Sequence, residues 1–321
     1  MNVYRRLPPP AARQPCAATI GNFDGVHRGH QALIGALVAG ARASGLASCV
    51  LTFEPHPREY FAGRAARAQA AAGAPVPAPP VRIANLRDKL EALEALGVDR
   101  VCVAHFDPTL ATMPAETFVT DFLAEGLQVR RLLIGDDFRF GARRAGDFAL
   151  LERIGPAAGI QVAAMPTVAD DGLRVSSSLV REALAVADFA RVEQLLGRPY
   201  RLAGRVIHGR KLGRELGFPT LNLRFPHGRP ALTGVFIVTV TGIDGTRTLP
   251  GVASLGTRPA VERDGRHLLE VHLLDWHGDA YGKLARVEFI AKLRDERPFD
   301  RLEDLARQID ADAQAARAHF R

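Results

Sequence analysis

Residues 16–45 read CAATIGNFDGVHRGHQALIGALVAGARASG, and this stretch decides the fold of the first half of the chain. Its first five residues form an apolar run typical of a buried strand, and residues 30–45 repeat apolar side chains at helical spacing. Glycines and two histidines lie between these two patterns. Glycines at a strand-to-helix turn permit close backbone approach, and a helix N-terminus favours an anion. The stretch therefore predicts a strand, a phosphate-binding turn and a helix.

The same order of apolar run and helical pattern recurs over the first 196 residues. SCVLTF precedes LRDKLEALEALG, VCVAHF precedes AETFVTDFLAEG, VRRLLIG precedes DFALLERIG, and QVAAM precedes SSSLVREALAVAD. Five such units predict an α/β domain over residues 1–196, with a parallel sheet that binds ligands at the carboxyl ends of its strands. We interpret the Ala- and Pro-rich stretch 63–80 as a flexible surface loop.

The pattern changes at Gly197. The following runs are short and punctuated by glycine: YRLAGRVI, GVFIVTV, GVASLG, HLLEVHLL and ARVEFIAK. A helical pattern then extends from about Phe299 to Phe320. Residues 197–321 are therefore predicted to form a second domain, a small β-barrel closed by a C-terminal helix.

Composition excludes several classes of protein. The chain has 321 residues, of which 47% are hydrophobic and 24% charged, as in ordinary globular proteins rather than disordered or fibrous ones. No run approaches the roughly 18 apolar residues of a membrane span, and the N-terminal stretch lacks the apolar core of a secretory signal. The three isolated cysteines match neither a disulfide framework nor a zinc site. We expect a cytoplasmic protein with no membrane partner.

The net charge of +7 has two explanations. Seven basic residues and one acidic residue, Glu215, lie between Arg201 and Arg229. Such a cluster can bind nucleic acid or handle phosphate groups of a small molecule. Because no basic stripe is interleaved with aromatic residues, we favour the phosphate-handling loop and expect no nucleic-acid partner.

The turn GNFDGVHRGHQ resembles the opening motif of the bifunctional bacterial riboflavin kinase/FAD synthetase family, which belongs to the HxGH nucleotidyltransferases. LTFEPHP at 51–57, GDDFRFG at 135–141 and SSSLVR at 176–181 resemble further motifs of that family, in the same order. The last is usually SSTxxR, and Ser178 keeps the hydroxyl of the usual threonine. The resemblance implies an N-terminal FMN adenylyltransferase domain that uses ATP and FMN and releases FAD and pyrophosphate.

The resemblance also implies roles for these residues. His27 and His30 would bind phosphate oxygens, with His30 nearest the transferred group. Arg181 and the serines before it would hold the β- and γ-phosphates. Such a transfer needs no covalent enzyme intermediate, so positioning and charge stabilisation should do most of the work. The remaining residues expected at this site are Gly21, Phe23, Asp24, Gly29, Phe53, His56, Asp137, Ser176 and Ser177.

Two of these assignments have an equally simple structural explanation. Phe53 and His56 could be ordinary loop packing. SSSLVRE taken alone could be a capped helix start. Asp24 either fixes the turn or meets Mg²⁺.

The segment 204–222, GRVIHGRKLGRELGFPTLN, is the most specific in the chain. Its glycines and basic residues, closed by Pro-Thr-Leu-Asn, are typical of a flexible cover over phosphates with an oxygen-bearing corner. It lacks the Gly-Lys-Ser/Thr of a Walker A motif. The segment resembles the riboflavin kinase domain, whose signature is usually PTAN, with Leu221 in place of alanine. By that resemblance Thr220 and Asn222 ligate Mg²⁺ on ATP, which suits hard oxygen ligands. The other residues expected to bind the nucleotide are Gly209, Lys211, Gly217 and Pro219. The alternative is a basic surface hairpin.

Glu270 is the candidate general base. It lies in HLLEVHLL, where alternation predicts that it faces inward with Leu268 and His272. An inward carboxylate costs stability unless it is used or paired. The resemblance implies that Glu270 takes the proton of the riboflavin 5′-hydroxyl, and it ranks Glu288 second. Arg294, at the start of a segment resembling the family's flavin loop, would contact the flavin.

Together these patterns predict an enzyme that phosphorylates riboflavin to FMN and then adenylylates FMN to FAD, with ATP and Mg²⁺. The alternatives are a riboflavin kinase with an inactive N-terminal domain, and a flavin- or nucleotide-binding regulator. A regulator would require losses among the proposed catalytic residues, and the sequence shows none of them.

Overall fold

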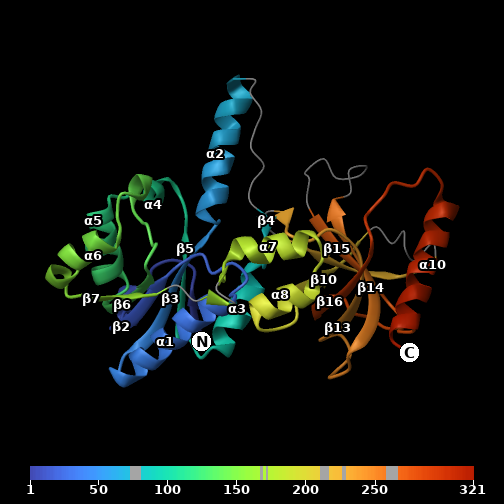
Figure 1. The fold of residues 1–321 in the computed structure, drawn as a ribbon, viewed down its shortest axis with the longest axis horizontal. Coiled ribbons are helices and arrows are strands. Elements are labelled where there is room, and N and C mark those ends of the chain that lie inside the picture. Colours follow the sequence, from blue (N-terminus) through green and yellow to red (C-terminus); the bar gives the residue numbers. More distant parts are fainter. Residues whose placement is uncertain (73–80, 167–168, 171–172, 210–216, 226–228, 258–266) are drawn as a thin grey trace. The chain divides into compact units, whose positions relative to one another are not determined.

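The chain folds into two compact units. The computed structural model describes residues 1–72, 81–166, 169–170, 173–209, 217–225, 229–257 and 267–321 (Figure 1). The first unit comprises Met1–Pro80 and Lys89–Ser176, and the second comprises Val81–Asp88 and Ser177–Arg321.

A six-stranded sheet organises the first unit. Its order is β1-β5-β3-β2-β6-β7, and every neighbouring pair is parallel. The strands are β1 (Asn2–Tyr4), β2 (Cys16–Ile20), β3 (Ala47–Glu54), β5 (Arg100–His105), β6 (Val129–Gly135) and β7 (Gln161–Met165). The predicted parallel α/β sheet is confirmed, and the carboxyl ends of β2, β3, β5 and β6 share one edge.

Helices connect and cover these strands. The longer ones are α1 (Arg28–Ala43), α2 (Pro57–Ala72), α3 (Leu86–Ala95), the π-helix η2 (Phe118–Gly126) and α6 (Phe148–Ile154). Shorter elements are η1 (Pro10–Ala12), α4 (Pro108–Thr112), α5 (Ala115–Thr117), η3 (Ala142–Arg144), η4 (Pro156–Ala158) and the strand pair β8 (Ala169–Asp170) and β9 (Leu173–Arg174). Helix α1 packs against β2, β3 and β6 through its apolar face, as its periodicity predicts.

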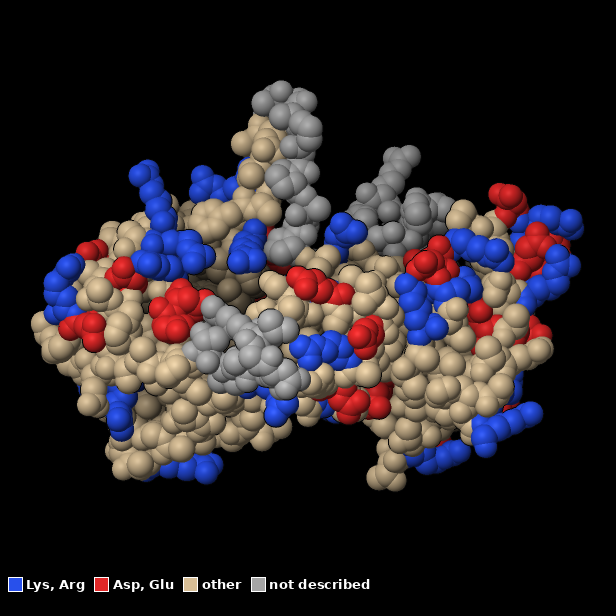
Figure 2. Space-filling view, viewed as in Figure 1, with Lys and Arg blue, Asp and Glu red and all other residues tan. Residues whose placement is uncertain are grey.

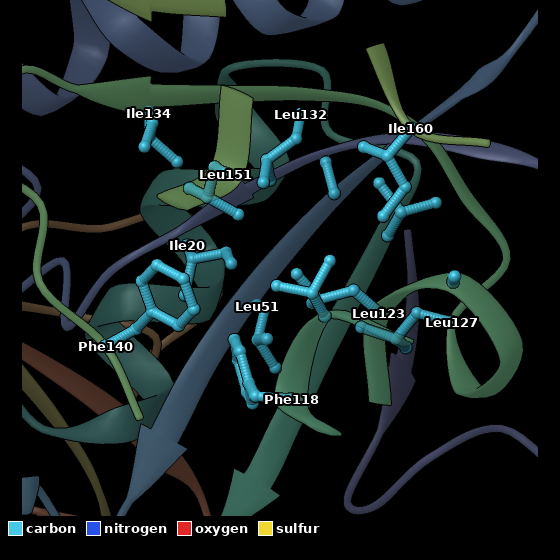
Figure 3. Packing of buried hydrophobic residues seen from close by; sticks show 14 of the residues in the cluster. Ile20, Leu51, Phe118, Leu123, Leu127, Leu132, Ile134, Phe140, Leu151 and Ile160 are labelled. Carbon is cyan, nitrogen blue, oxygen red and sulfur yellow. The ribbon is translucent and has the colours of Figure 1, made fainter. Parts of the chain in front are cut away.

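The core of the first unit lies against one face of the sheet. Figure 3 shows Ile20 and Leu51 from neighbouring strands packed with Phe118, Leu123 and Phe140. The three cysteines are buried and free, and all belong to this core.

The interpretation of stretch 63–80 as a loop is wrong over its described part. Helix α2 runs from Pro57 to Ala72 and projects away from the sheet in Figure 1. Alanine is the strongest helix former, proline fits the first helical position and Glu59 suits the first turn. These local preferences outweigh the low complexity of the stretch. Residues 73–80 lie outside the described residues.

A closed barrel of order β10-β11-β15-β14-β13-β16 forms the second unit, and the C-terminal helix follows it, as predicted. The barrel strands are β10 (Arg201–Ile207), β11 (Thr220–Arg224), β13 (Gly234–Thr241), β14 (Leu249–Thr257), β15 (His267–Leu273) and β16 (Leu284–Arg294). The remaining elements are α7 (Ser177–Ala185), α8 (Phe189–Leu196), α10 (Leu302–His319) and the parallel pair β4 (Val81–Arg82) and β12 (Arg229–Pro230).

Helices cover the barrel wall. Helix α10 packs beside β14 through Ala313 and Ala316, both fully buried (Figure 1). Phe189 of α8 lies 6.1 Å from the ring of Phe236 and stacks on Phe289 at 6.4 Å. These apolar contacts explain why α8 folds with the barrel.

Candidate active sites

The turn after β2 is held by packing against its own glycine. Gly21 N donates to the Leu51 carbonyl at 3.0 Å, and the buried Phe23 ring lies over Gly21. A Cβ on Gly21 would stand 2.9 Å from Phe23 Cζ, which only glycine avoids. Phe23 and Val26 have φ values of 47° and 43°, a strained left-handed conformation that surrounding structure must impose. This turn is therefore built to one shape.

His27 caps helix α1. It is 5% exposed, and its Nδ1 accepts a hydrogen bond from the backbone N–H of His30 at 3.3 Å. With Nδ1 engaged as an acceptor, Nε2 is the ring nitrogen that can donate to a ligand. His27 thus offers one N–H donor at the helix N-terminus.

His30 stacks on His27. Their ring centroids are 3.6 Å apart at 20°, and Phe23 meets His30 edge-on at 5.1 Å. Burial, then the charges of His27 and Lys89, lower the pKa of His30 well below 6.5. Its Nδ1 is buried and has no hydrogen-bond partner among the described residues. The ring is therefore neutral at pH 7, ready to donate to an incoming anion.

Because Gly29 has no side chain, the backbone at Val175 can lie close to this turn. A Cβ on Gly29 would lie 3.2 Å from both the His27 ring and the Val175 carbonyl. Val175, the residue before the serine motif, therefore lies beside the turn, and Ser176 belongs to the same unit as the histidines. Ser177 and Arg181 belong to the second unit, in α7, where Arg181 Nε donates to the Val81 carbonyl at 2.8 Å.

Other expected residues lie along the carboxyl edge of the sheet. Asp24 is buried in the turn, and Asp137 is exposed directly after β6. Phe53 at the end of β3 packs edge-on against Phe106 at 5.8 Å. His56 Nδ1 accepts from the backbone N–H of Arg58 at 3.0 Å, within the first turn of α2.

Sequence reasoning missed a buried polar layer next to the turn. Lys89, 5% exposed, donates through Nζ to Thr52 Oγ1 at 3.2 Å. The Thr52 hydroxyl donates in turn to the Asn22 carbonyl at 3.3 Å. Lys89 lies four residues before the buried Leu93, on the same face of the helix, so helical spacing could have indicated its burial.

The second group of residues lies on the outer wall of the barrel. In β15 the buried side chains are His267, Leu269, Val271 and Leu273, whereas Glu270 is half-exposed. The prediction that Glu270 faces inward with Leu268 and His272 is therefore wrong. In an alternating strand either the even-numbered or the odd-numbered side chains can face the interior, and leucines occur in both sets here. In the structure the odd-numbered set, which includes Leu269, Val271 and Leu273, fills the interior.

Glu270 shares its face with Asn222. These two residues are direct partners across β11 and β15, and Ser254 of β14 is the partner of Glu270 on its other side. Thr220 pairs with His272 one step along. Because directly opposed residues point to the same face, the oxygens of Thr220, Asn222, Ser254 and Glu270 line one outer strip.

Gly209 lies against the Asn222 amide. A Cβ on Gly209 would be 2.3 Å from Asn222 Nδ2 and 2.6 Å from its Cγ. The Pro219 carbonyl is 3.0 Å from His272 Nδ1, and Gly217 has a φ of 86°. Gly209 thus contacts Asn222, while the Pro219 carbonyl and Thr220 lie beside His272. Lys211 lies outside the described residues.

Arg294 is held by helix α10. Its Nε and Nη2 donate to the Asp312 carboxylate at 3.1 and 2.8 Å, and the Gln308 side chain donates to the same carboxylate at 3.0 Å. Asp312 is 6% exposed. In this arrangement Arg294 anchors the last barrel strand to the helix. The carboxylate of Glu296, just beyond it, accepts a hydrogen bond from Ser254 Oγ.

The outer strip suits a magnesium ion better than a transition metal. The described residues contain no cluster of three or more histidine, cysteine or acidic side chains able to hold a metal by themselves. Mg²⁺ usually takes one or two protein oxygens and completes its shell with phosphates and water. Thr220 and Asn222, with an amide that Gly209 leaves room for, fit that demand.

The distribution of surface charge is relevant to nucleic-acid binding, and the length and hydropathy of the helices are relevant to membrane insertion. Figure 2 shows basic and acidic side chains interspersed over the face in view. Within the described ranges, no helix combines the length and apolar character that crossing a bilayer requires.

Comparison with known proteins gives matches over almost the whole chain. Residues 10–179 match the family model of FAD synthetase, and residues 196–320 match that of riboflavin kinase. A bifunctional riboflavin kinase/FMN adenylyltransferase of Pseudomonas fluorescens is 50% identical over 303 residues, 94% of this chain and 92% of that protein. The protein of the same name from Escherichia coli (strain K12) is 43% identical over 310 residues, 97% of this chain and 94% of its own.

A solved structure also matches from end to end. The crystal structure of a protein described as a macrolide-efflux protein from Streptococcus pneumoniae has a TM-score of 0.71 and 26% identity. The match covers 98% of each chain. The two-unit architecture therefore recurs in an experimentally determined structure.

Proposed function

The chain belongs to the bifunctional riboflavin kinase/FMN adenylyltransferase family, and from this premise we propose how its residues carry the two reactions. The enzyme phosphorylates riboflavin with ATP to give FMN and ADP. It then transfers the adenylyl group of a second ATP to FMN, giving FAD and pyrophosphate. ATP, riboflavin and FMN are its substrates and FAD is its final product.

Adenylyl transfer takes place at the turn after β2. An oxygen of the FMN phosphate attacks the α-phosphorus of ATP, and pyrophosphate leaves. His27 and His30 donate to the phosphate oxygens on which charge accumulates, where fixed donors contribute most. The stacked, buried histidine pair at a helix N-terminus supports this assignment, because ring N–H groups and the positive end of the helix dipole both favour an anion there. Ser176, Ser177 and Arg181 hold the leaving pyrophosphate.

Riboflavin phosphorylation takes place on the outer strip of the barrel. The Glu270 carboxylate takes the proton of the riboflavin 5′-hydroxyl, whose oxygen attacks the γ-phosphorus of ATP as ADP leaves. The register of Glu270 with Asn222 supports this assignment, since it sets the base beside the proposed nucleotide corner. Its outward position leaves the carboxylate open to a substrate, which an inward one would not be.

Mg²⁺ would be held by Thr220 and Asn222 together with ATP phosphates. When bound, the ion neutralises charge on the transferred phosphoryl group. Gly209 keeps the space in which the Asn222 amide takes its place. The family resemblance implies this ion, and the hard oxygen donors of Thr220 and Asn222 support the proposal.

We assign the adenylyltransferase to residues 1–196 and the kinase to residues 197–321. The family models support this division, since one ends at residue 179 and the other begins at residue 196. The second compact unit begins earlier, at Ser177, so α7 and α8 fold with the barrel. We place the enzyme in the cytoplasm, where its small-molecule substrates are found.

Two variants assayed with both substrates test these assignments. Glu270→Gln keeps shape and hydrogen bonding but removes the base, so riboflavin phosphorylation should fall about 10²–10⁴-fold while added FMN is still adenylylated. His30→Ala should lower adenylylation about 10²–10³-fold and leave phosphorylation intact. Normal FMN formation by Glu270→Gln would remove the base assignment. A His30→Ala enzyme that loses phosphorylation instead would reverse the division of labour.

A further inference from the structure

Lys89 is a buried lysine near the start of helix α3, on the same helix face as the buried Leu93. It is 5% exposed, and lysine is almost never fully buried unless its charge is satisfied. The hydrogen bond that Lys89 makes in this buried position is therefore part of how the chain keeps a cation there.

A single hydroxyl links this cation to the histidine turn. Lys89 Nζ donates to Thr52 Oγ1 at 3.2 Å, and the fully buried Thr52 donates to the Asn22 carbonyl at 3.3 Å. Asn22 lies in the turn five residues before His27. The ammonium thus fixes, through Thr52, the backbone from which His27 and His30 are presented.

The Lys89 charge also reaches His30. Together with burial and the charge of His27, it disfavours protonation of the His30 ring and lowers its pKa. A cation that acts on His30 acts equally on an anion that contacts His30. Lys89 therefore contributes a positive charge that is in place before ATP arrives, which is the form of charge stabilisation that needs no reorganisation during the reaction.

The helix start holds Lys89 in position. Asn85 and Asp88 cap each other: Asp88 N donates to Asn85 Oδ1 at 3.0 Å, and Asn85 N donates to Asp88 Oδ2 at 3.2 Å. This reciprocal capping fixes the first turn of α3, and Lys89 follows directly. A long, flexible side chain is thus anchored at its base and at its tip.

We propose that Lys89 is a positioning residue for adenylyl transfer, which shapes the histidine turn through Thr52 and supplies a fixed positive charge behind it. The proposal rests on the proposed function, in which His27 and His30 carry that transfer. Lys89 acts through these residues rather than on the flavin reaction of the barrel.

The test uses the full-length enzyme, whose kinase reaction reports on folding. Lys89→Met removes the charge and keeps the length of the side chain. The kcat for conversion of FMN to FAD should fall about 10²-fold, the scale of a reacting group misplaced by ~1 Å, with riboflavin phosphorylation within twofold of wild type. Lys283→Met is the matched control, because Lys283 Nζ donates to a carbonyl in the barrel unit at 2.9 Å, and it should leave adenylylation unchanged.

Histidine NMR titration separates charge from structure. The pKa of His30 should rise in Lys89→Met, because one repelling cation is gone, and should stay at its wild-type position in Thr52→Val, which keeps the cation. Thr52→Val breaks the link to Asn22, so its kcat for FAD formation should fall about tenfold, as expected for one lost hydrogen bond. His30→Gln assigns the resonance.

The outcomes distinguish a failure of the role of Lys89 from a failure of the proposed role of the histidines in adenylyl transfer. If His30→Ala retains adenylylation, the proposed function fails. If His30→Ala loses it while Lys89→Met keeps the normal kcat, only the role of Lys89 is overturned. Should Lys89→Met lose both activities through misfolding, Thr52→Val decides, and a wild-type kcat in that variant overturns the proposal.

Discussion

Adding one methyl group at Gly209 should disable the kinase reaction and spare the other. In Gly209→Ala the new Cβ would meet Asn222 Nδ2 at 2.3 Å, Cγ at 2.6 Å and Oδ1 at 2.7 Å. All three distances are below the 3.0 Å that real Cβ contacts observe, so the whole amide must move. The Gly209 backbone is not left-handed, so alanine fits its conformation and the amide absorbs the change.

The expected loss follows from what that amide does. Asn222 is 6% exposed and in register with Glu270, so it has little room to retreat without leaving its place beside the base. A displacement of ~1 Å at a positioned group costs about 10²-fold in rate. We therefore expect the kcat for riboflavin phosphorylation to fall about 10²-fold in Gly209→Ala.

The assay measures FMN from riboflavin and, separately, FAD from added FMN. Adenylylation should match wild type, because it uses the other site. Gly35→Ala is the control: its Cβ meets nothing within 4 Å in helix α1, so both rates should persist and stability should rise by about 0.5–1 kcal/mol. A Gly209→Ala enzyme that phosphorylates riboflavin within threefold of wild type would refute the placement of Asn222 at the nucleotide.

Four further outcomes follow from the same contacts. Gly21→Ala should push the Phe23 ring from its 2.9 Å contact and lower FAD formation from FMN about tenfold or more, with normal FMN formation from riboflavin. Arg294→Met, which leaves a buried carboxylate without its cation, should lower the free energy of unfolding of the barrel unit by about 3 kcal/mol in urea titration, whereas Arg307→Met at an exposed pair should cost under about 1 kcal/mol. Because the pKa of His30 is lowered on folding, the unfolded chain binds the extra proton, so stability should decline as pH falls below about 6.5, and less steeply in His30→Gln. Removing Mg²⁺ with a chelator should stop FMN formation, and restoring the ion should recover it.

The sequence predicts best where periodicity and turn chemistry agree. The strand and helix around the histidine turn fall close to the predicted residues, because an apolar run, a glycine turn and a helical face all indicate the same structure. The barrel and its last helix are predicted for the same reason. Strand β11 is not among the predicted strands, because Thr-Leu-Asn indicates a ligand-binding turn by its chemistry and is too short to show a strand pattern.

The failures have physical causes. Helix α2 was missed because low complexity was weighed above the helix propensity of alanine. Glu270 was given the wrong face because alternation alone does not say which phase fills the interior. The hydrogen bond of Lys89 with Thr52 is not predicted, because the two residues are distant in sequence and only tertiary structure brings them together.

The most direct test of the account is a time course of the wild-type enzyme with riboflavin, ATP and Mg²⁺, with flavins and nucleotides separated by chromatography. FMN and ADP should appear first, in equal amounts, and FAD should follow after a lag with one pyrophosphate released per FAD. With His30→Ala the same mixture should accumulate FMN and stop there. Formation of FAD without prior FMN, or loss of FMN formation in His30→Ala, would contradict two consecutive reactions at two separate sites.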